Sequence, residues 1–404
     1  MPALVVIGLL CFAGSLPDSP DRLVRIGLFS LFKPDTLHVR ILPGNSASLT
    51  AGGLAHIPVE PGQTIRIKSS GRQLSVSILD SYGRLRLNAA ATEAEVRPEP
   101  AGVLELSLPG RMKRGVRGSL SVKAVEGEAS GLLRIVLETE RESAVASIVA
   151  AEMAGEREAE AIKALAIVVR SFVLSHRGRH QKQEFDFCDT THCQLFRGEA
   201  DLSGEEFSPV VESAVAATEN RFLVYRNLPV EGHYTAACGG MSVSPAMVWG
   251  GKVASGYPYR RIACEWCHSS RHSRWERKAN AEAVFEALGE GASGRISPAA
   301  EILIQVVKPG DLVRSVIVRD RGRSLEFGTE RFRRLIGRQL GWNTVLSPTF
   351  RVERRGRSLI FRGRGFGSQV GLCVAGAFAQ AAAGRSWREI LNFYYPETEI
   401  KRIA

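Results

Sequence analysis

The sequence predicts an α+β fold, with a β-rich N-terminal region over residues 22–130 and a mixed α/β body over 131–404. In the first part, apolar and polar residues alternate in short segments, which is typical of antiparallel strands. Near Ser143 the apolar period changes to the helical one. The chain has 404 residues, of which 44% are hydrophobic and 24% charged, so it can bury a sizeable core and is not a disordered protein.

Strands are expected where the alternation is most regular. It is clearest over 64–68, 74–78 and 104–108. Glycine and proline clusters such as Pro43-Gly44 and Pro61-Gly62 supply turns between such strands. The spacing therefore predicts a series of antiparallel strands joined by short turns.

Helices are expected in the second part of the chain. A stripe of apolar residues predicts a helix over about 158–174, and a second helical stretch lies near 210–218. Ser386 and Glu389 fit a capping box that opens a short helix before Pro396. The helices favour an α+β arrangement, because they follow the run of strands rather than alternating with it.

The N-terminus carries an uncharged apolar run over residues 3–13, followed by Gly14, Ser15 and Pro17. This predicts a signal peptide or short membrane anchor over 1–17, and hence an extracytoplasmic protein of the cell envelope or a secreted one. The run is shorter than the about 20 residues that span a bilayer, and it lacks a positive flank. A buried N-terminal strand is the alternative.

The net charge of +11 comes mostly from arginines scattered along the chain. It predicts attraction to polyanions, among which nucleic acid, anionic lipid and acidic cell-wall polymers are candidates. A solvated basic face is favoured over a nucleic-acid groove. The glycines from Gly363 to Gly371 do not fit G-x-G-x-x-G, and Gly250-Gly251-Lys252 lacks the rest of a P-loop, so no nucleotide is expected.

Glu152 stands at the end of the uncharged run over 148–151, before a segment crowded with solvated glutamates. A carboxylate beside apolar side chains loses hydration, which raises its pKa as a general acid requires. The alternative is that Glu152 begins or caps a helix, where acidic residues are common.

A loop rich in metal-binding side chains follows the predicted helix. It contains Cys188 and Cys193 together with His180 and His192, which are the ligand types of a tetrahedral structural zinc site. The spacing is not that of a standard zinc finger. A Cys188–Cys193 disulfide or a reduced loop without a ligand are the alternatives.

Two further motifs contain cysteine. In Cys238-Gly239-Gly240 the paired glycines let the backbone approach a bulky group or form a tight turn. Cys264 and Cys267 form a C-x-x-C motif, but no βαβ pattern surrounds it as in redox proteins. A structural disulfide, or pairing of one of the two with Cys238, is the expected use.

Taken together, these segments resemble the SpoIID/LytB family of sporulation stage II protein D and amidase-enhancer relatives. The resemblance covers about residues 22–403, with a signature over 145–240 and a glycine-rich C-terminal segment over 361–397. It rests on motifs in the family's order: Ala151-Glu152-Met153, Arg170-Ser171-Phe172, Cys188 to Gln194, Cys238-Gly239-Gly240, Trp249-Gly250 and Ser386-Trp387-Arg388-Glu389.

The resemblance implies a peptidoglycan lytic transglycosylase that acts on glycan strands stripped of their stem peptides, with Glu152 as the acid. It also implies one structural zinc held by Cys188 and Cys193, with His180 or His192 as the nitrogen ligands. The substrate-binding residues expected from it are Lys163, Arg170, Tyr234, Gly239 and Gly240. For Arg170, a pair with a nearby acid on the surface is the alternative.

The sequence departs from the family pattern at several positions. Thr235 and Ala236 stand where family members commonly have His and Ser, and Ser368-Gln369 replaces the His-Gly of the C-terminal glycine motif. Two histidines expected to line the cleft are therefore missing. The alternative function is a non-catalytic protein that binds the cell wall or activates a wall amidase.

Overall fold

The computed structural model describes residues 22–99, 102–127, 131–153, 155, 157–198, 209–251, 253–292, 294–307 and 311–403. The expected signal peptide or anchor over 1–17 lies outside the described residues. Among the described helices, none has the length and apolar character needed to cross a membrane.

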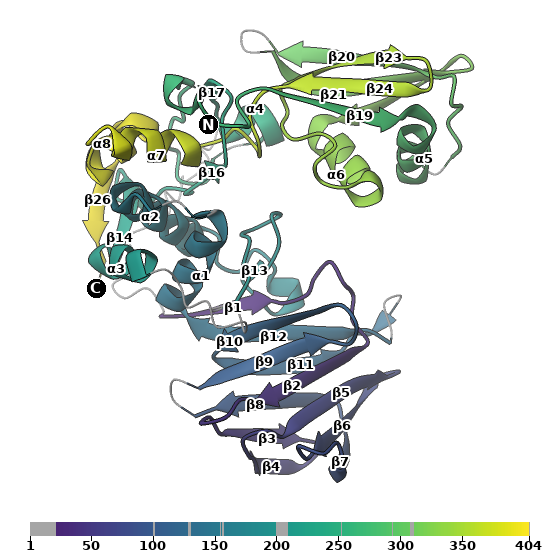
Figure 1. The fold of residues 1–404 in the computed structure, drawn as a ribbon, viewed down its shortest axis with the longest axis vertical. Coiled ribbons are helices and arrows are strands. Elements are labelled where there is room, and N and C mark those ends of the chain that lie inside the picture. The colour runs from purple at the N-terminus through teal and green to yellow at the C-terminus, as the bar shows by residue number, and fades with distance from the viewer. Residues whose placement is uncertain are drawn as a thin grey trace, which may run out of the picture.

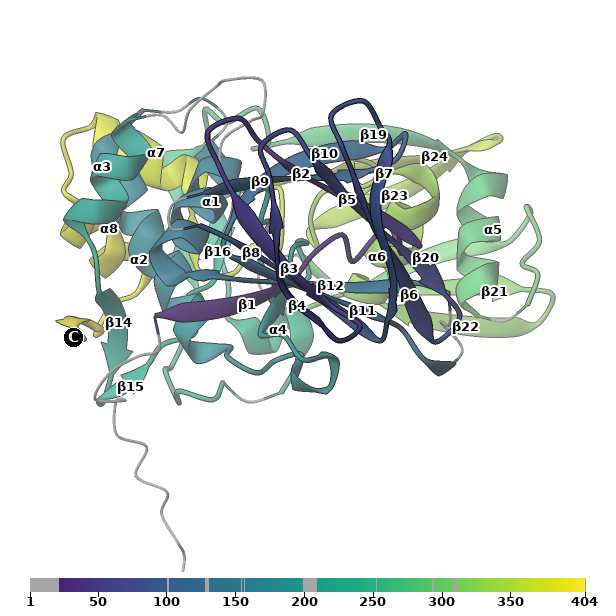
Figure 2. The same cartoon turned by 90° about the horizontal axis from the view of Figure 1, so that it is seen from below.

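The predicted α+β fold is confirmed, with the β-rich part first and the mixed part after it. Figure 1 shows three layers: a β-sandwich at the bottom, a group of helices in the middle and a smaller α/β module at the upper right. Seen from below, with the sandwich strands nearest the viewer, the helices lie toward the left and the module toward the right (Figure 2). One hydrophobic core runs through the sandwich and the helices, and the module has its own.

The sandwich consists of two sheets, whose strand orders are β13-β1-β12-β11-β8-β3-β4 and β10-β9-β2-β5-β6-β7. Within it, only the β1–β13 pair is parallel among the described strand pairings. Its strands are β1 (Leu23–Gly27), β2 (Thr36–Ile41), β3 (Ala47–Ala51), β4 (Leu54–Val59), β5 (Thr64–Ser70), β6 (Gln73–Leu79), β7 (Leu85–Ala91), β8 (Glu93–Pro98), β9 (Val103–Leu108), β10 (Met112–Arg117), β11 (Ser119–Ala124), β12 (Leu133–Glu140) and β13 (Phe187–Cys188).

The alternation of the sequence determines which side chains fill the sandwich. In β5, Ile65 and Ile67 are buried while Arg66 and Lys68 face solvent, as a half-buried strand requires. The strands expected over 64–68, 74–78 and 104–108 are present. Strand β12 pairs with β1 and β11, so the sandwich extends beyond residue 130 to Glu140.

The central helix of the middle layer is α2, which packs against α1, α3, α7 and α8. It is buried on most of its surface, including Ile162 and Val169. The expected helices and the Ser386–Glu389 capping box are present. The bounds of this layer are α1 (Arg141–Met153), α2 (Ala159–Ser175), α3 (Pro209–Ala217), α7 (Val374–Ala382) and α8 (Trp387–Tyr394).

Short elements join these helices. They are the 3-10 helices η2 (Gln181–Gln183) and η3 (Glu265–Cys267), the helix α4 (Pro245–Trp249), and the strands β14 (Arg221–Tyr225), β15 (Leu228–Pro229), β16 (Tyr234–Thr235), β17 (Met241–Ser242), β18 (Ile262–Ala263), β25 (Leu372–Cys373) and β26 (Glu399–Arg402). The parallel pair β16–β25 brings residues 234–235 and 372–373, which are far apart in the sequence, side by side.

Residues 274–366, which we call the inserted module, interrupt the body that the sequence predicted as one domain over 131–404. The module packs the helices α5 and α6 against two small sheets around Phe285, Phe332 and Phe361. Its elements are β19 (Trp275–Asn280), α5 (Ala281–Gly291), β20 (Glu301–Val307), β21 (Leu312–Asp320), β22 (Arg323–Gly328), α6 (Thr329–Leu340), β23 (Phe350–Arg355) and β24 (Ser358–Gly363).

Candidate active site and metal centres

Glu152 lies in the last turn of α1, one residue before the helix ends at Met153. The alternative that it begins or caps a helix is therefore wrong. The C-terminal end of a helix carries partial negative charge, so a carboxylate there is disfavoured rather than stabilised. This placement gives Glu152 no role in helix stability and favours its neutral form.

The surroundings of Glu152 also favour the protonated acid. The Tyr234 hydroxyl lies 3.2 Å from Glu152 Oε1 and 2.7 Å from Gln194 Oε1. Burial raises the pKa of Glu152, and this effect outweighs the opposing hydrogen bond from Tyr234 and the charge of Arg197. A raised pKa is what a carboxyl group needs to act as a general acid.

Three separate segments build this site. Glu152 comes from α1, Tyr234 from β16, and the buried Gln194 from the residue that directly follows Cys193. Strand β16 is fixed by its parallel pairing with β25, in which Tyr234 stands opposite Leu372. The three segments around residues 152, 194 and 234 thus meet at the Tyr234 hydroxyl group.

The four ligands expected in the Cys/His loop come together. His180 Nε2 lies 3.2 Å from Cys193 Sγ, and His192 Nδ1 lies 3.7 Å from Cys188 Sγ and 3.5 Å from Cys193 Sγ. All four ligand atoms lie within 4.8 Å of one another. Tetrahedral zinc with ordinary bond lengths separates sulfur from nitrogen by about 3.5 Å. The donor set and its distances therefore fit zinc, with both histidines included.

The sandwich holds this loop in place. Strand β13, which ends at Cys188, adds in parallel to β1. The buried Asp189 carboxylate accepts hydrogen bonds from the backbone N–H of Phe29 and Ser30, at 2.7 and 3.3 Å, and pairs with Arg114 at 2.8 Å. The N-terminal region thus anchors the loop that carries Gln194.

A second group of ligands was not predicted as a metal site. The thiols of Cys238, Cys264, Cys267 and Cys373 are all buried and lie within 4.8 Å of one another, so they could hold a metal ion such as zinc. The expected disulfide is absent among these residues. The sulfur atoms of Cys238 and Cys267 are 3.6 Å apart, and all four cysteines of this group are free. The C-x-x-C motif was a visible signal, but Cys373 stands alone in the sequence far from the other three.

The role expected for Arg170 needs correction. Its side chain is fully buried, and its guanidinium pairs with Glu142 on α1 at 2.7 Å and donates to the carbonyl of Arg221 at 3.2 Å. Because no part of Arg170 reaches solvent, it joins α1 to α2 rather than contacting substrate. Lys163 pairs with Glu160 at 2.7 Å, and its substrate role stays a prediction.

The two glycines of the Cys238-Gly239-Gly240 motif allow a close backbone approach. Gly239 has a φ of 65°, and a Cβ atom there would lie 2.5 Å from the backbone nitrogen of Gly365. The bulky group next to Gly239 is therefore the returning chain at 364–365, not a ligand. Gly240 has a φ of 100° and its carbonyl accepts from the N–H of Cys264 at 3.1 Å, which shapes the cysteine cluster.

The departures from the family pattern form a buried polar network. Thr235 Oγ1 donates to the Phe366 carbonyl at 2.9 Å and accepts from the Gln369 N–H at 3.1 Å. The Gln369 amide accepts from Thr349 Oγ1 and donates to the Cys238 carbonyl, both at 2.7 Å. Gln369 has a φ of 65°, a conformation that favours the glycine of the family motif. The hydrogen bonds of the Gln369 side chain and backbone offset that strain.

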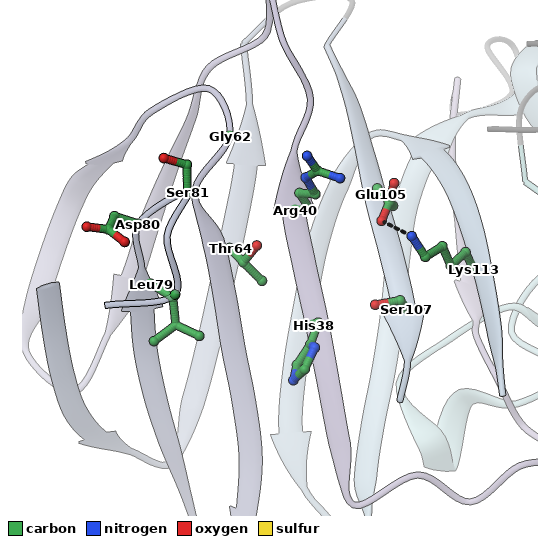
Figure 3. A pocket seen from close by; sticks show the side chains of 11 residues that line it. His38, Arg40, Gly62, Thr64, Leu79, Asp80, Ser81, Glu105, Ser107 and Lys113 are labelled. Carbon is green, nitrogen blue, oxygen red and sulfur yellow. Dashed lines mark ion pairs between the residues drawn. The ribbon is translucent and has the colours of Figure 1, made fainter. Parts of the chain in front are cut away.

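A shallow hollow of about 410 Å³ lies on the sandwich (Figure 3). His38 and Arg40 line it from β2, and Lys113 pairs with Glu105 at its edge. These side chains belong to strands of the six-stranded sheet, whereas Glu152 lies on α1 and both cysteine groups lie outside that sheet. The hollow is therefore separate from the candidate active site.

Comparison with known proteins gives a family match over the part of the chain that carries Glu152 and the Cys/His loop. The SpoIID family model, described as "Stage II sporulation protein", matches residues 129–225, a range that includes Glu152 and the Cys/His loop. Stage II sporulation protein D of Bacillus subtilis is 27% identical over 64% of this chain and 74% of its own length.

Two further relatives match a similar share of the chain. Stage II sporulation protein D of Bacillus amyloliquefaciens is 24% identical over 64% of this chain and 73% of its own length. An uncharacterized protein of Brachyspira hyodysenteriae is 27% identical over 66% of this chain and 68% of its own length. Residues 129–225 thus match the SpoIID family, and about two thirds of the chain is similar to proteins named Stage II sporulation protein D.

Proposed function

We propose that this protein is a peptidoglycan lytic transglycosylase of the cell envelope, with Glu152 as its general acid. The observation that carries the proposal is the half-buried carboxyl group at the C-terminal end of α1, joined to Tyr234. The helix end and the loss of hydration both favour the protonated form that an acid catalyst needs. Glycan strands, denuded by resemblance to the family, are the proposed substrate.

The reaction needs one carboxyl group. Glu152 gives its proton to the glycosidic oxygen as the bond from that oxygen to the anomeric carbon breaks. The 6-hydroxyl of the same muramic acid then attacks the anomeric carbon, and its proton returns to the Glu152 carboxylate. The products are an anhydro-muramic end and a free 4-hydroxyl, and no water is consumed.

Tyr234 and Gln194 hold the acid in position. The Tyr234 hydroxyl contacts both side chains, and Gln194 follows Cys193 directly. A zinc ion bound by His180, Cys188, His192 and Cys193 would supply a structural cross-link in the loop. Through the chain connection from Cys193 to Gln194, that loop fixes the partner of Tyr234.

The test is digestion of denuded glycan by the full chain and by Glu152→Gln. We expect anhydro-muramic ends from the wild type and their loss, by about two orders of magnitude or more, in the variant. Glu158→Gln is the matched control, because Glu158 is exposed just before α2. Full activity of Glu152→Gln, with the fold intact by circular dichroism, would exclude Glu152 as the acid.

A wall-binding or amidase-activating protein is the second candidate. It is favoured by the absence of the two histidines expected at positions 235 and 368. Thr235 instead accepts a hydrogen bond from the Gln369 N–H in a buried network. Under this candidate the partners are wall glycan and a cell-wall amidase. Binding to wall sacculi without release of anhydro-muramic ends would support it over the first.

A further inference from the structure

We propose that Cys238, Cys264, Cys267 and Cys373 form a zinc site with four thiolate ligands, which we call the tetrathiolate site, and that its metal clamps the base of the inserted module. This site is separate from the Cys/His loop and goes beyond the proposed function. Its ligands come from three places: the loop after β16, the C-x-x-C motif around η3, and the junction of β25 with α7.

The sulfur positions match a metal site better than a disulfide. The observed Cys238–Cys267 separation is 3.6 Å, and the four Sγ atoms all lie within 4.8 Å. Four thiolates around tetrahedral zinc stand about 3.8 Å apart, because each Zn–S bond is about 2.3 Å. A disulfide would hold two of the four sulfurs about 2.05 Å apart. It would not explain why the other two cysteines also lie close to that pair.

Hydrogen bonds prepare the sulfur atoms to carry negative charge. Cys373 Sγ accepts from the backbone N–H of Cys238 at 3.2 Å and from that of Gly376 at 3.4 Å. The Tyr394 hydroxyl lies 3.2 Å from Cys264 Sγ. Cys373 is also the N-cap of the nine-residue α7, whose positive end favours a thiolate. Such outer contacts are typical of sulfur ligands that bind a metal.

Glycines make room for the cluster. A Cβ atom on Gly376 would lie 2.2 Å from the Tyr394 hydroxyl and 3.0 Å from Cys264 Sγ. Gly239 and Gly240, both with positive φ, turn the chain after Cys238. The space around the four sulfurs is thus closed and complete, as in a structural zinc site that keeps no open position.

The tetrathiolate site stands where the inserted module leaves the body. Cys267 comes a few residues before the module and Cys373 a few residues after it. The two connecting arms touch between these points, where the Gly365 N–H donates to the His272 carbonyl at 2.8 Å. Phe366 also pairs with Ala237, which directly precedes Cys238. A metal held by Cys264, Cys267 and Cys373 closes the loop at its base and limits how the module moves.

Metal analysis of the full chain, purified without added zinc or chelator, tests the site. We compare the wild type with Cys188→Ser/Cys193→Ser, which removes the loop ligands, and with Cys264→Ser/Cys267→Ser, which removes half of the tetrathiolate site. We expect the first variant to retain one zinc per chain and the second to have one fewer than the wild type. Cobalt in the first variant should give the visible absorption of a tetrathiolate complex.

The Cys188→Ser/Cys193→Ser variant keeps the test decisive even where the Cys264→Ser/Cys267→Ser variant fails to fold. If the Cys188→Ser/Cys193→Ser variant folds without metal, or has a mass lower by four hydrogens from two disulfides, the tetrathiolate site is overturned.

Zinc removal by a chelator should speed hydrogen exchange in 264–275 and 362–373 but not in β5. Unchanged exchange in both arms overturns the clamp. Neither readout depends on glycan cleavage, so the two proposals fail independently.

Discussion

At the scale of single residues, Glu152 shows how position changes the chemistry of an ordinary side chain. The neighbouring Glu158 is solvated, whereas Glu152 lies half-buried against Tyr234 at the negative end of α1. Burial raises the pKa of Glu152. A raised carboxyl pKa makes the folded state bind its proton more tightly than the unfolded state does.

This shift predicts that Glu152→Gln stabilises the protein at neutral pH. As pH rises above the ordinary glutamate range, the unfolded wild type loses the Glu152 proton while the folded state retains it, so wild-type stability falls until the raised pKa is passed. The amide of the variant does not titrate. Urea unfolding across the pH range should show equal stability in acid and a more stable variant at pH 7.

Activity should follow the same titration. Since only protonated Glu152 can act, cleavage of glycan should decline as pH rises through the raised pKa. Glu158→Gln, the control, should alter neither curve. A variant that is less stable than wild type at every pH would mean that Glu152 has a structural role instead.

At the scale of elements, the ion pair between the buried Arg170 and the partly buried Glu142 joins α1, which carries the acid, to the central helix α2. Arg170 has no exposed surface and makes several hydrogen bonds. Breaking a buried pair by removing one partner costs roughly 3–5 kcal/mol. Arg170→Ala should therefore lower the free energy of unfolding by about that amount, measured by urea denaturation.

The same variant separates a structural role from a substrate role. If Arg170 only joins the helices, the KM for glycan of the folded fraction stays unchanged at a temperature where the variant is folded. Arg97→Ala is the control, because its pair with Glu95 on β8 is exposed and contributes little. A large increase in KM with unchanged stability would restore Arg170 as a substrate contact.

At the scale of the whole molecule, the positive charge is concentrated rather than scattered. The inserted module, residues 274–366, has 19 basic and 10 acidic residues, a net charge of +9 out of +11 for the chain. On α6, Arg334 and Arg338 are exposed on the face opposite Phe332 and Ile336. The module is thus the part of the protein that attracts polyanions most strongly.

Sedimentation with wall sacculi at increasing salt tests whether the positive charge of the inserted module determines binding. Arg334→Gln/Arg338→Gln should weaken binding at low salt and reduce its dependence on salt. The control is Arg66→Gln/Lys68→Gln, which removes the same charge from the exposed face of β5. Equal loss in both variants would mean that net charge, not the module, determines binding.

The sequence by itself determined the features that depend on local order. The alternation of apolar and polar residues predicted the strands of the sandwich, and the apolar stripe at helical spacing predicted α2. Ser386 with Glu389 predicted the start of α8. These patterns come from neighbours a few residues apart, which the backbone geometry repeats. The loop ligands His180, Cys188, His192 and Cys193 were predictable for another local reason, because metal-binding side chains stand close together in this short segment of the sequence.

Only the tertiary structure decided the contacts between distant segments. It placed the Tyr234 hydroxyl in contact with the Glu152 carboxyl group and paired the buried Arg170 with Glu142. It also brought Cys373 next to the C-x-x-C motif and gave residues 274–366 a core of their own. Such contacts have no periodic signal, because strand pairing and helix packing join residues whose separation in the chain is arbitrary. A local pattern therefore identifies an element, while the fold determines which side chains meet.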